Sequence, residues 1–439
     1  MKFKPYPSYK DSGIEWLGEV PEHWDIQPIK YVIDKIESGT SVNATDEPAT
    51  DNEIGVLKTS CVYSGQFNPF ENKTVITEEI DRVSCPLKIG VLIVSRMNTP
   101  DLVGAAGLVA TAPTNLFLPD RLWQISFLKA NSTYVYYWTQ STMYRAFIKS
   151  VCSGTSSSMQ NLSQDQFRSF VFPSPDNKEQ SAIANFLDRE TLRIDELVEE
   201  KIRFIELLKE KRQSLISHVV TKGLDPTVKM KDSGVDWLGE VPEHWGIKRI
   251  KHLCEIRKRI AGKEGYPVLS ITQRGIKVKD TISGEGQLAM DYSKYQFVEI
   301  GDFAMNHMDL LTGYVDLSNF HGVTSPDYRV FTLTDKKSID RYFLYLMQMG
   351  YKNKIFYSYG QGVANIGRWR LQTDSFNNFS VPYPNKKEQQ QIVDFLDAQT
   401  TKIDTLITET QQSITLLKEH RTALISAAVT GKIDVREAA

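Results

Sequence analysis

The sequence lacks the features of several large protein classes. It holds no run of about eighteen apolar residues, which argues against a membrane-spanning helix. The opening segment MKFKPYPSYKDSG lacks the apolar core of a signal peptide. The four cysteines show no CxxC spacing, which argues against a zinc site and against a disulfide framework. A reducing cytoplasm is the compartment that these absences favour.

Motifs for catalysis are also scarce. No GxxxxGK[ST] element is present, which argues against an ATP-driven motor. An adenine methyltransferase would need an Asn/Asp-Pro-Pro-aromatic element, and Asn68-Pro69-Phe70 lacks its second proline. Two segments resemble the carboxylate–lysine core of a metal-dependent nuclease: Pro326-Asp327 with Asp335-Lys336-Lys337, and Pro175-Asp176 with Glu199-Glu200-Lys201. The second falls on an expected continuous helix and the first has a short spacer, so a nuclease is a weak alternative.

Length and charge bound the remaining choices. A chain of 439 residues suggests about two to four domains, and 41% hydrophobic with 24% charged residues is typical of a globular protein. The net charge of −2 hides an uneven distribution. Residues 246–384 hold 19 Lys/Arg against 13 Asp/Glu, whereas residues 25–175 hold 12 against 14. If this chain binds DNA, partners are expected to supply much of the positive charge.

The chain contains an internal repeat. Residues 10–26 (KDSGIEWLGEVPEHWDI) and 231–247 (KDSGVDWLGEVPEHWGI) agree at 14 of 17 positions, at an offset of 221. Residues 178–225 and 387–434 agree at 24 of 48 positions, at an offset of 209. The segments between these copies are poorly alike. The sequence therefore predicts a twofold frame that carries two different inserts, for two ligands or two halves of one ligand.

This organisation predicts five segments, with two insert domains between three parts of the frame. They are an N-terminal frame segment 1–24, a first insert domain 25–175, a central frame 176–245, a second insert domain 246–384, and a C-terminal helix 385–439.

The second pair of repeats predicts two long helices. Asp176 and Asn385 follow prolines and are N-cap candidates, and Glu179 and Glu388 complete a capping-box pattern three residues later. We expect the helices to end near the two glycines at 223 and 431. A seven-residue recurrence, backed by Leu197 and Leu406, predicts a packed seam. It runs through Leu187, Ile194, Leu208 and Leu215 in the first copy, and through Leu396, Ile403, Leu417 and Leu424 in the second.

The helix from residue 178 to 221 would measure roughly 66 Å, against about 34 Å for one turn of B-DNA. The chain order predicts that the two helices pack antiparallel and that the molecule approximates its own dimer. A plain structural spacer or a dimerisation coil is the alternative. His23 and His244 occupy equivalent positions and are expected to cap or pack against the helices rather than to act as acids or bases.

Both inserts predict mixed α/β structure. Strands are expected at 55–58 and 89–94 in the first insert, and at 266–271 and 300–305 in the second. A helix is expected at 134–150 and another at 341–354. Each is followed by a polar, glycine-containing loop, at 152–161 and at 360–370. Short polar side chains on such loops can contact phosphates and base edges, although an ordinary surface loop is the alternative for any single residue.

The WLGEVPEHW elements, the proline-rich entries at 173–180 and 382–389, and the helix ends at 215–223 and 424–432 together resemble the specificity subunit of Type I restriction–modification enzymes. The resemblance implies an α+β fold with two mixed α/β target-recognition domains separated by two long antiparallel helices, in an internal pseudo-twofold repeat. It also implies a non-catalytic protein in which each domain reads one half of a bipartite DNA site. A protein-interaction scaffold with two binding inserts is the alternative function.

The resemblance further implies partners. Two modification (adenine methyltransferase) subunits bind the duplicated regions, restriction (endonuclease) subunits join them, and double-stranded DNA is the ligand. Adenosylmethionine, ATP and magnesium would belong to those partners, with no cofactor or metal in this chain. Polarity on the expected loops selects eleven candidate DNA contacts. They are Lys58, Arg96, Ser156, Gln160 and Asn161 in the first insert, and Arg274, Lys277, Gln361, Asn365, Arg368 and Arg370 in the second.

Overall fold

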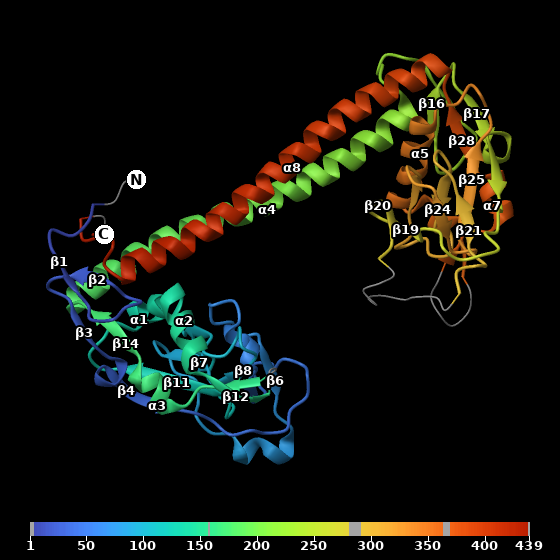
Figure 1. The fold of residues 1–439 in the computed structure, drawn as a ribbon. Helices are drawn as coiled ribbons and strands as arrows, with labels where there is room; N and C mark the ends of the chain where they lie inside the picture. Colours follow the sequence, from blue (N-terminus) through green and yellow to red (C-terminus); the bar gives the residue numbers. More distant parts are fainter. Residues whose placement is uncertain (1–3, 157–158, 281–290, 363–368, 438–439) are drawn as a thin grey trace. The chain divides into compact units, whose positions relative to one another are not determined.

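The computed structural model describes residues 4–156, 159–280, 291–362 and 369–437. The chain forms two compact units, one comprising residues 1–201 and 411–439 and the other residues 202–410 (Figure 1). Each unit therefore combines one insert with part of both long helices. Within the described ranges, no helix is long and apolar enough to cross a membrane.

The insert of the first unit is built on a four-stranded antiparallel sheet in the order β4-β11-β7-β9. Its strands are β4 (Ile33–Glu37), β7 (Leu92–Ser95), β9 (Ala106–Leu108) and β11 (Leu122–Phe127). A second sheet has the order β10-β5-β6, with β10 (Leu116–Phe117) parallel to β5 (Gly55–Leu57) and β6 (Asn72–Thr74) antiparallel to β5. Every residue of β7 is buried, so this strand lies in the core.

Smaller elements complete the first unit. Short strands form a third sheet and two pairs: β8 (Met97–Asn98), β13 (Met159–Asn161) and β12 (Ser153–Ser156); β3 (Asp25–Pro28) with β14 (Val171–Ser174); and β1 (Tyr9–Asp11) with β2 (Glu19–Pro21). The short helices are α1 (Ser132–Thr139), α2 (Thr142–Val151), α3 (Gln164–Ser169), η1 (Ile29–Tyr31), η2 (Thr59–Val62) and η3 (Thr77–Arg82).

The second unit repeats this plan with different details. Its main sheet has the order β18-β25-β22-β23, all antiparallel. The strands are β18 (Cys254–Arg257), β22 (Phe303–Met305), β23 (Val315–Leu317) and β25 (Arg329–Leu333). The paired strands around it are β15 (Met230–Asp232) with β16 (Glu240–Pro242), β17 (Gly246–Arg249) with β28 (Ser380–Tyr383), β19 (Leu269–Thr272) with β20 (Gly275–Val278), β21 (Gln296–Val298) with β24 (Gly322–Thr324), and β26 (Gln361–Gly362) with β27 (Trp369–Arg370). The short helices are η4 (Ile250–His252), α5 (Asp340–Lys352), α6 (Ile355–Ser358) and α7 (Thr373–Asn378).

The two long helices are α4 (Asn177–Lys222) and α8 (Lys386–Val429), of 46 and 44 residues. In the first unit Arg421 of α8 pairs with Asp195 of α4 at 2.9 Å. In the second unit Arg212 of α4 pairs with Asp404 of α8 at 3.1 Å. The two arginines are equivalent in the repeat, as are the two aspartates, so each unit forms the same ion pair with the copies exchanged. This pattern is the one expected of antiparallel helices, and it confirms the internal pseudo-twofold repeat.

The packed seam is confirmed in part. Leu187, Ile194, Leu396 and Leu424 are buried at 5% exposure or less. The assignment of Leu197 and Leu406 to the seam is wrong, because they are 38% and 43% exposed. The adjoining Val198 and Ile407 are half-buried instead. The seam also includes buried Thr191 and Thr400, whose hydroxyls donate to the carbonyl oxygens of Leu187 and Leu396.

Several expected elements of the inserts differ in their limits. The helix expected at 134–150 is two helices, because the Ser141 hydroxyl accepts from the Tyr144 N–H and starts α2. The polar segment expected as a loop at 152–161 includes strands β12 and β13. The strands expected from 89 and 300 begin later, after Gly90 and Gly301, whose φ values of 75° and 87° place turns there.

Candidate functional site

Polar side chains of the first unit gather on the sheet β8–β13–β12. Its register places Gln160 of β13 opposite Asn98 of β8. Arg96 directly precedes β8, and its carbonyl oxygen accepts from the N–H of Leu162, directly after β13. The sheet therefore brings Arg96, Gln160 and Asn161 together, with the backbone of Ser156 on the adjoining strand β12.

Hydrogen bonds connect this sheet to helix η2. The side-chain amide of buried Asn98 donates to the Tyr63 hydroxyl over 2.8 Å, and that hydroxyl shares a further 2.8 Å bond with Thr59. Lys58 is the N-cap residue of the same helix. Together with Tyr63 and Arg121, Lys58 lines a hollow of about 470 Å³. Helix η2 and Tyr63 thus connect Lys58 to the sheet that carries the other candidates.

The polar groups of this surface are partly unsatisfied. The buried Oε1 atom of Gln160 has no hydrogen-bond partner among the described residues, whereas Asn161 is exposed. The Nε atom of Arg96 donates to the carbonyl oxygen of Asp120 over 2.8 Å, which fixes the direction of the guanidinium. Side-chain amides offer both donors and acceptors, so this surface can form hydrogen bonds with base edges.

The second unit places Gln361 and Arg370 opposite each other in the pair β26–β27. Between them in the chain, Trp369 packs its ring 4.9 Å from that of Tyr357 and accepts at its carbonyl oxygen from the Leu310 N–H. Predicted contacts Asn365 and Arg368 lie outside the described residues.

A second pair of predicted residues lies on the hairpin β19–β20. Arg274 is exposed at its turn, and Lys277 is exposed on β20 opposite Ser270. The neighbouring Gln273 side chain donates to the carbonyl oxygen of Thr312. Leu310 contacts β27, and Thr312 contacts the hairpin β19–β20. The candidates on β26–β27 and those on the hairpin therefore lie on either side of residues 310–312.

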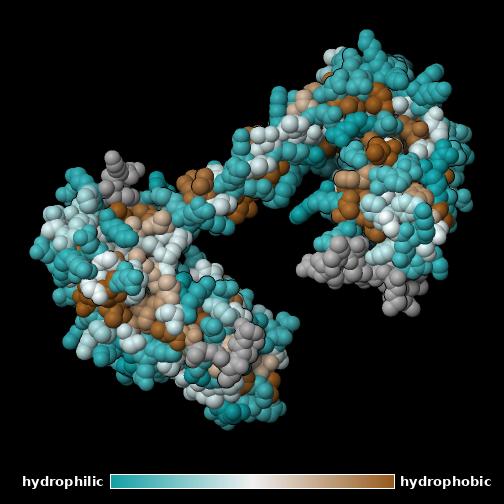
Figure 2. All heavy atoms as spheres, in the orientation of Figure 1, coloured by the Kyte–Doolittle hydropathy of each residue, from teal (hydrophilic) through white to brown (hydrophobic). Residues whose placement is uncertain are grey.

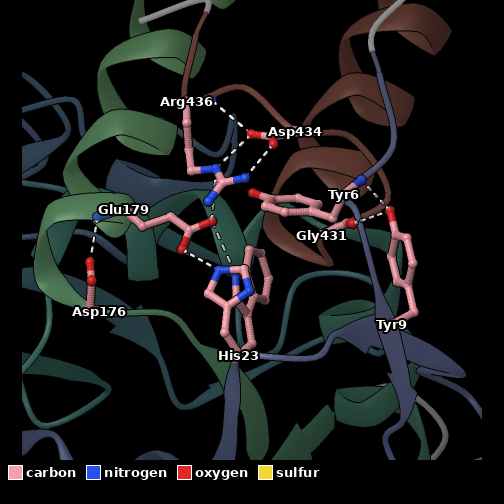
Figure 3. A network of polar contacts seen from close by, with 9 residues as sticks. Tyr6, Tyr9, His23, Asp176, Glu179, Gly431, Asp434 and Arg436 are labelled. Carbon is pink, nitrogen blue, oxygen red and sulfur yellow. Dashed lines mark hydrogen bonds and ion pairs between the residues drawn. The ribbon is translucent and has the colours of Figure 1, made fainter.

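The frame holds a repeated polar cluster at the start of each long helix. In the first unit the Glu179 carboxylate forms a 2.8 Å hydrogen bond with His23 Nε2 (Figure 3). It also accepts a hydrogen bond from the Trp24 indole N–H at 3.1 Å. In the second unit Glu388 receives the equivalent groups of His244 and Trp245 at 2.9 Å and 2.8 Å. The two histidines therefore pack against the helix starts, as their positions in the repeat predict.

The model of the Type I restriction modification DNA specificity domain matches this chain twice, over residues 21–207 and 242–416. Each match includes one insert and the start of the long helix after it, and together they cover well over half of the chain. This chain belongs to that family. It is therefore a specificity subunit, the non-catalytic DNA-recognition component of a Type I restriction–modification system, and not an unrelated interaction scaffold.

Known specificity subunits match over different lengths. The MjaVIII specificity subunit of Methanocaldococcus jannaschii is 22% identical, covering 98% of this chain and 97% of that protein. The EcoEI specificity subunit of Escherichia coli is 27% identical over 171 residues, which is 38% of this chain and 28% of that protein.

Two solved structures share the fold of this specificity subunit. A chain from a study of complex assembly and conformational transition of the type I R-M system gives a TM-score of 0.67 at 13% identity, covering 94% of this chain and 99% of that one. The HsdS subunit of Thermoanaerobacter tengcongensis gives 0.52 at 15% identity, covering 94% and 98%.

The capping-box prediction is half right for this specificity subunit. The Asp176 and Asn385 side chains accept from the N–H groups of Glu179 and Glu388, as expected. The two glutamate carboxylates do not turn back to the cap backbone. Each is held by the histidine and tryptophan of the preceding PEHW element, because the buried indole N–H needs an acceptor.

Sequence reasoning missed the C-terminal residues of the first cluster. Arg436 forms a two-point contact with Asp434, at 2.9 and 2.6 Å, and its Nε atom lies 4.0 Å from Glu179 (Figure 3). Its guanidinium also lies 5.0 Å from the ring centroid of Tyr6. The repeat of residues 387–434 ends at Asp434 and does not reach Arg436, so the sequence carried no pattern that could have found the arginine.

The nuclease-like residues are engaged in other contacts. The Asp335 carboxylate accepts from the hydroxyls of Tyr383 and Ser338 and pairs with Lys248 at 3.6 Å. Asp176 caps α4. Within the described ranges no cluster of three or more His, Cys, Asp and Glu residues could hold a metal ion.

Proposed function

We propose that each insert domain of this specificity subunit, residues 25–175 and 246–384, reads one half of a bipartite DNA site. One observation supports this proposal most directly. The contacts between each insert and the long helices are the same in both units, whereas the polar surfaces of the two inserts differ. The Tyr134 hydroxyl donates to the carbonyl oxygen of Val429 at the end of α8, and the equivalent Tyr342 hydroxyl donates to that of Val220 near the end of α4. Two inserts that are attached to the helices in the same way but differ in their polar surfaces suit a DNA site with two different halves.

The two surfaces differ in chemistry. In the first unit cations and amides are balanced, with Lys58 and Arg96 beside Gln160 and Asn161. In the second unit cations predominate among the described candidates, with Arg274, Lys277 and Arg370 beside Gln361. Amide side chains pair well with adenine and guanidinium groups with guanine in the major groove, whereas lysines mainly contact phosphates. The full set of proposed contacts is Lys58, Arg96, Ser156, Gln160, Asn161, Arg274, Lys277, Gln361, Asn365, Arg368 and Arg370.

The helical frame is proposed to dock two modification (adenine methyltransferase) subunits, which restriction subunits then join. Apolar side chains on the outer faces of the helices support this, and Figure 2 shows brown patches along the helical part of the molecule. In the first unit Leu192 and Leu416 are 60% and 64% exposed, and in the second Phe204 and Leu207 are 45% and 62% exposed. Exposed apolar residues that recur on one element are typical of protein contacts.

The chemistry of the assembled enzyme is proposed to lie in those partners. They would bind adenosylmethionine, ATP and magnesium, and this chain would contribute no cofactor site. Since the ligand is cellular DNA, the complex is placed in the cytoplasm.

Asn161→Ala in the assembled complex tests direct base reading. Loss of one base contact should cost about 1–3 kcal/mol and relax a single position of one half-site. The measurement is binding to a set of duplexes in which each base pair of the site is changed in turn. Lys58→Ala is the matched comparison, and as a phosphate contact it should weaken all duplexes equally. Asn161→Ala that also weakens every duplex equally would contradict the assignment of Asn161 to base reading.

A further inference from the structure

A buried arginine begins the central strand of the second unit. Arg329 is 4% exposed at the start of β25. One Nη2 hydrogen bond of 3.1 Å reaches the carbonyl oxygen of Leu371, directly after β27, and the guanidinium lies 4.4 Å from the ring centroid of Phe376. The Leu371 N–H donates in turn to the carbonyl oxygen of His307. Arg329 is thus attached to the strand that carries Arg370.

Among the described residues Arg329 has no counter-charge. No carboxylate there pairs with it, and its buried Nη1 atom has no hydrogen-bond partner. His307, 8% exposed, is close by, and its buried Nδ1 atom also lacks a partner in the described part of the chain.

Electrostatics show that these groups act on one another. Burial, followed by the charges of Arg329 and Arg370, lowers the pKa of His307 to about 3, so its imidazole is neutral at physiological pH. Burial and the charge of Arg370 lower the pKa of Arg329, against an opposing effect of Tyr351, to about 10. Two like charges and a neutral imidazole therefore lie within electrostatic reach of one another, an arrangement that an anion would stabilise.

The fold itself does not need a cation there. In the first unit the corresponding place on the central strand β11 is held by Trp123, which is buried. Trp123 pairs with Val94, four residues after Gly90, as Arg329 pairs with Met305, four residues after Gly301, and both pack on equivalent phenylalanines, Phe167 and Phe376. An uncharged aromatic side chain at the equivalent place satisfies the packing of the first insert, so the charge of Arg329 is a property of the second insert alone.

We propose that Arg370, Arg329 and His307 form a binding site for one backbone phosphate of DNA. This proposal rests on the proposed DNA reading by the second insert. Half-buried Arg370 contacts the phosphate, and buried Arg329 behind it supplies a second positive charge in a poorly solvated place, where charge acts strongly. Neutral His307 can donate one N–H to the same anion. The site fixes the register of the second insert on the duplex, and the base contacts then read the sequence.

The test is a scan of neutral methylphosphonate linkages through the second half-site, with binding measured for the complete complex. In wild type, one linkage should weaken binding about tenfold. In Arg329→Leu, which replaces the buried cation by an apolar side chain, and in Arg370→Gln, the same linkage should have little further effect. Both variants should also reduce the slope of log K against log salt by about one.

Two conservative variants separate charge from attachment. Arg329→Gln can still donate to the Leu371 carbonyl oxygen but carries no charge, whereas Arg329→Lys keeps the charge. Recovery of the phosphate effect in Arg329→Lys and not in Arg329→Gln is expected. Recovery in Arg329→Gln would overturn the proposal, because Arg329 would then only hold the strand.

The remaining outcomes are also decisive. Lys337→Gln removes an exposed charge of the same unit. In this variant the same methylphosphonate linkage should still weaken binding as it does in wild type. Wild type that binds the split site with no single sensitive linkage in the second half would overturn the phosphate site while leaving DNA reading intact. Wild type that binds no split site would instead refute the proposed function. Inorganic phosphate that raises the melting temperature of wild type but not of Arg329→Leu, without any linkage effect, would show a free-anion site and overturn the DNA assignment.

Discussion

Glu179 and Glu388 show how single residues define the frame. Each lies in the first turn of a long helix, and each accepts from a tryptophan that is almost completely buried. A buried indole N–H without an acceptor is costly. The carboxylate therefore fixes the PEHW element to the start of the helix that follows the insert, and so fixes where the insert begins and ends.

Replacing Glu179 by alanine should lower the free energy of unfolding by about 1–3 kcal/mol, because the Trp24 N–H loses its acceptor. Glu388→Ala should have a similar effect through Trp245. Arg436→Ala should cost less than about 1 kcal/mol, because that side chain is 43% exposed and reaches Glu179 only at 4.0 Å. Urea unfolding followed by tryptophan fluorescence measures all three. Equal losses for Glu179→Ala and Arg436→Ala would contradict this account.

Residue roles were predictable where the pattern is local. The caps Asp176 and Asn385 follow from a short motif, and the structure confirms them. The partners of the Glu179 carboxylate could not be foreseen, because Trp24 and Arg436 reach it from opposite ends of the chain. Side-chain positions of the DNA contacts remain predictions for the same reason: an exposed polar residue reveals its role only through its ligand.

At the scale of elements, the two long helices end in unequal surroundings. Gly223 and Gly431 both have left-handed φ values, of 80° and 73°. A Cβ atom on Gly431 would lie 2.3 Å from the Pro21 ring, whereas one on Gly223 would lie 3.3 Å from the nearest ring atom of Trp245. The end of α8 is thus packed more tightly on its PEHW element than the end of α4.

Gly431→Ala should therefore destabilise more than Gly223→Ala. The backbone strain common to both is about 1 kcal/mol, and the clash with Pro21 should add about 1–3 kcal/mol more. Thermal unfolding of the two variants beside wild type provides the measurement. A larger loss for Gly223→Ala would show that the contact with Pro21 does not limit the end of α8.

The exchanged ion pairs should respond to charge reversal. Asp195→Arg places two cations together in the first unit and should cost about 1 kcal/mol after solvent screening, and Asp195→Arg with Arg421→Asp should restore most of that loss. The equivalent exchange at Asp404 and Arg212 is the matched control. Its effect should be smaller, since those side chains are 56% and 36% exposed against 39% and 21%. No recovery in the first double variant, measured by urea unfolding, would contradict a direct pair.

Elements with strong periodicity were predicted well, and short ones less well. The long helices follow from repeated apolar spacing and caps. The break at Ser141 was missed because Tyr, Phe and Ile continue the apolar pattern across it. Leu197 and Leu406 were placed in the seam by hydrophobicity, but the adjoining Val198 and Ile407 are the less exposed residues, and two neighbouring apolar residues do not reveal which of them faces inward.

At the scale of the whole molecule, the helical frame is repeated within one chain, and the inserts attached to it differ. The caps, the glutamate clusters, the tyrosines at the helix ends and the ion pairs all occur once in each unit. The inserts share a four-stranded sheet, but the candidate contacts of one combine cations and amides equally, whereas those of the other are mainly cations. Such a molecule can change one half of its target without disturbing the other.

The most direct test of this account is a genome-wide map of modified adenines in three kinds of cell: with this gene, without it, and with residues 25–175 replaced by the first insert of another specificity subunit. We expect a split motif that is lost without the gene, and a chimera in which one half of the motif changes while the other half is kept. A chimera that modifies the original motif, or one in which both halves change together, would contradict the division of reading between the two inserts.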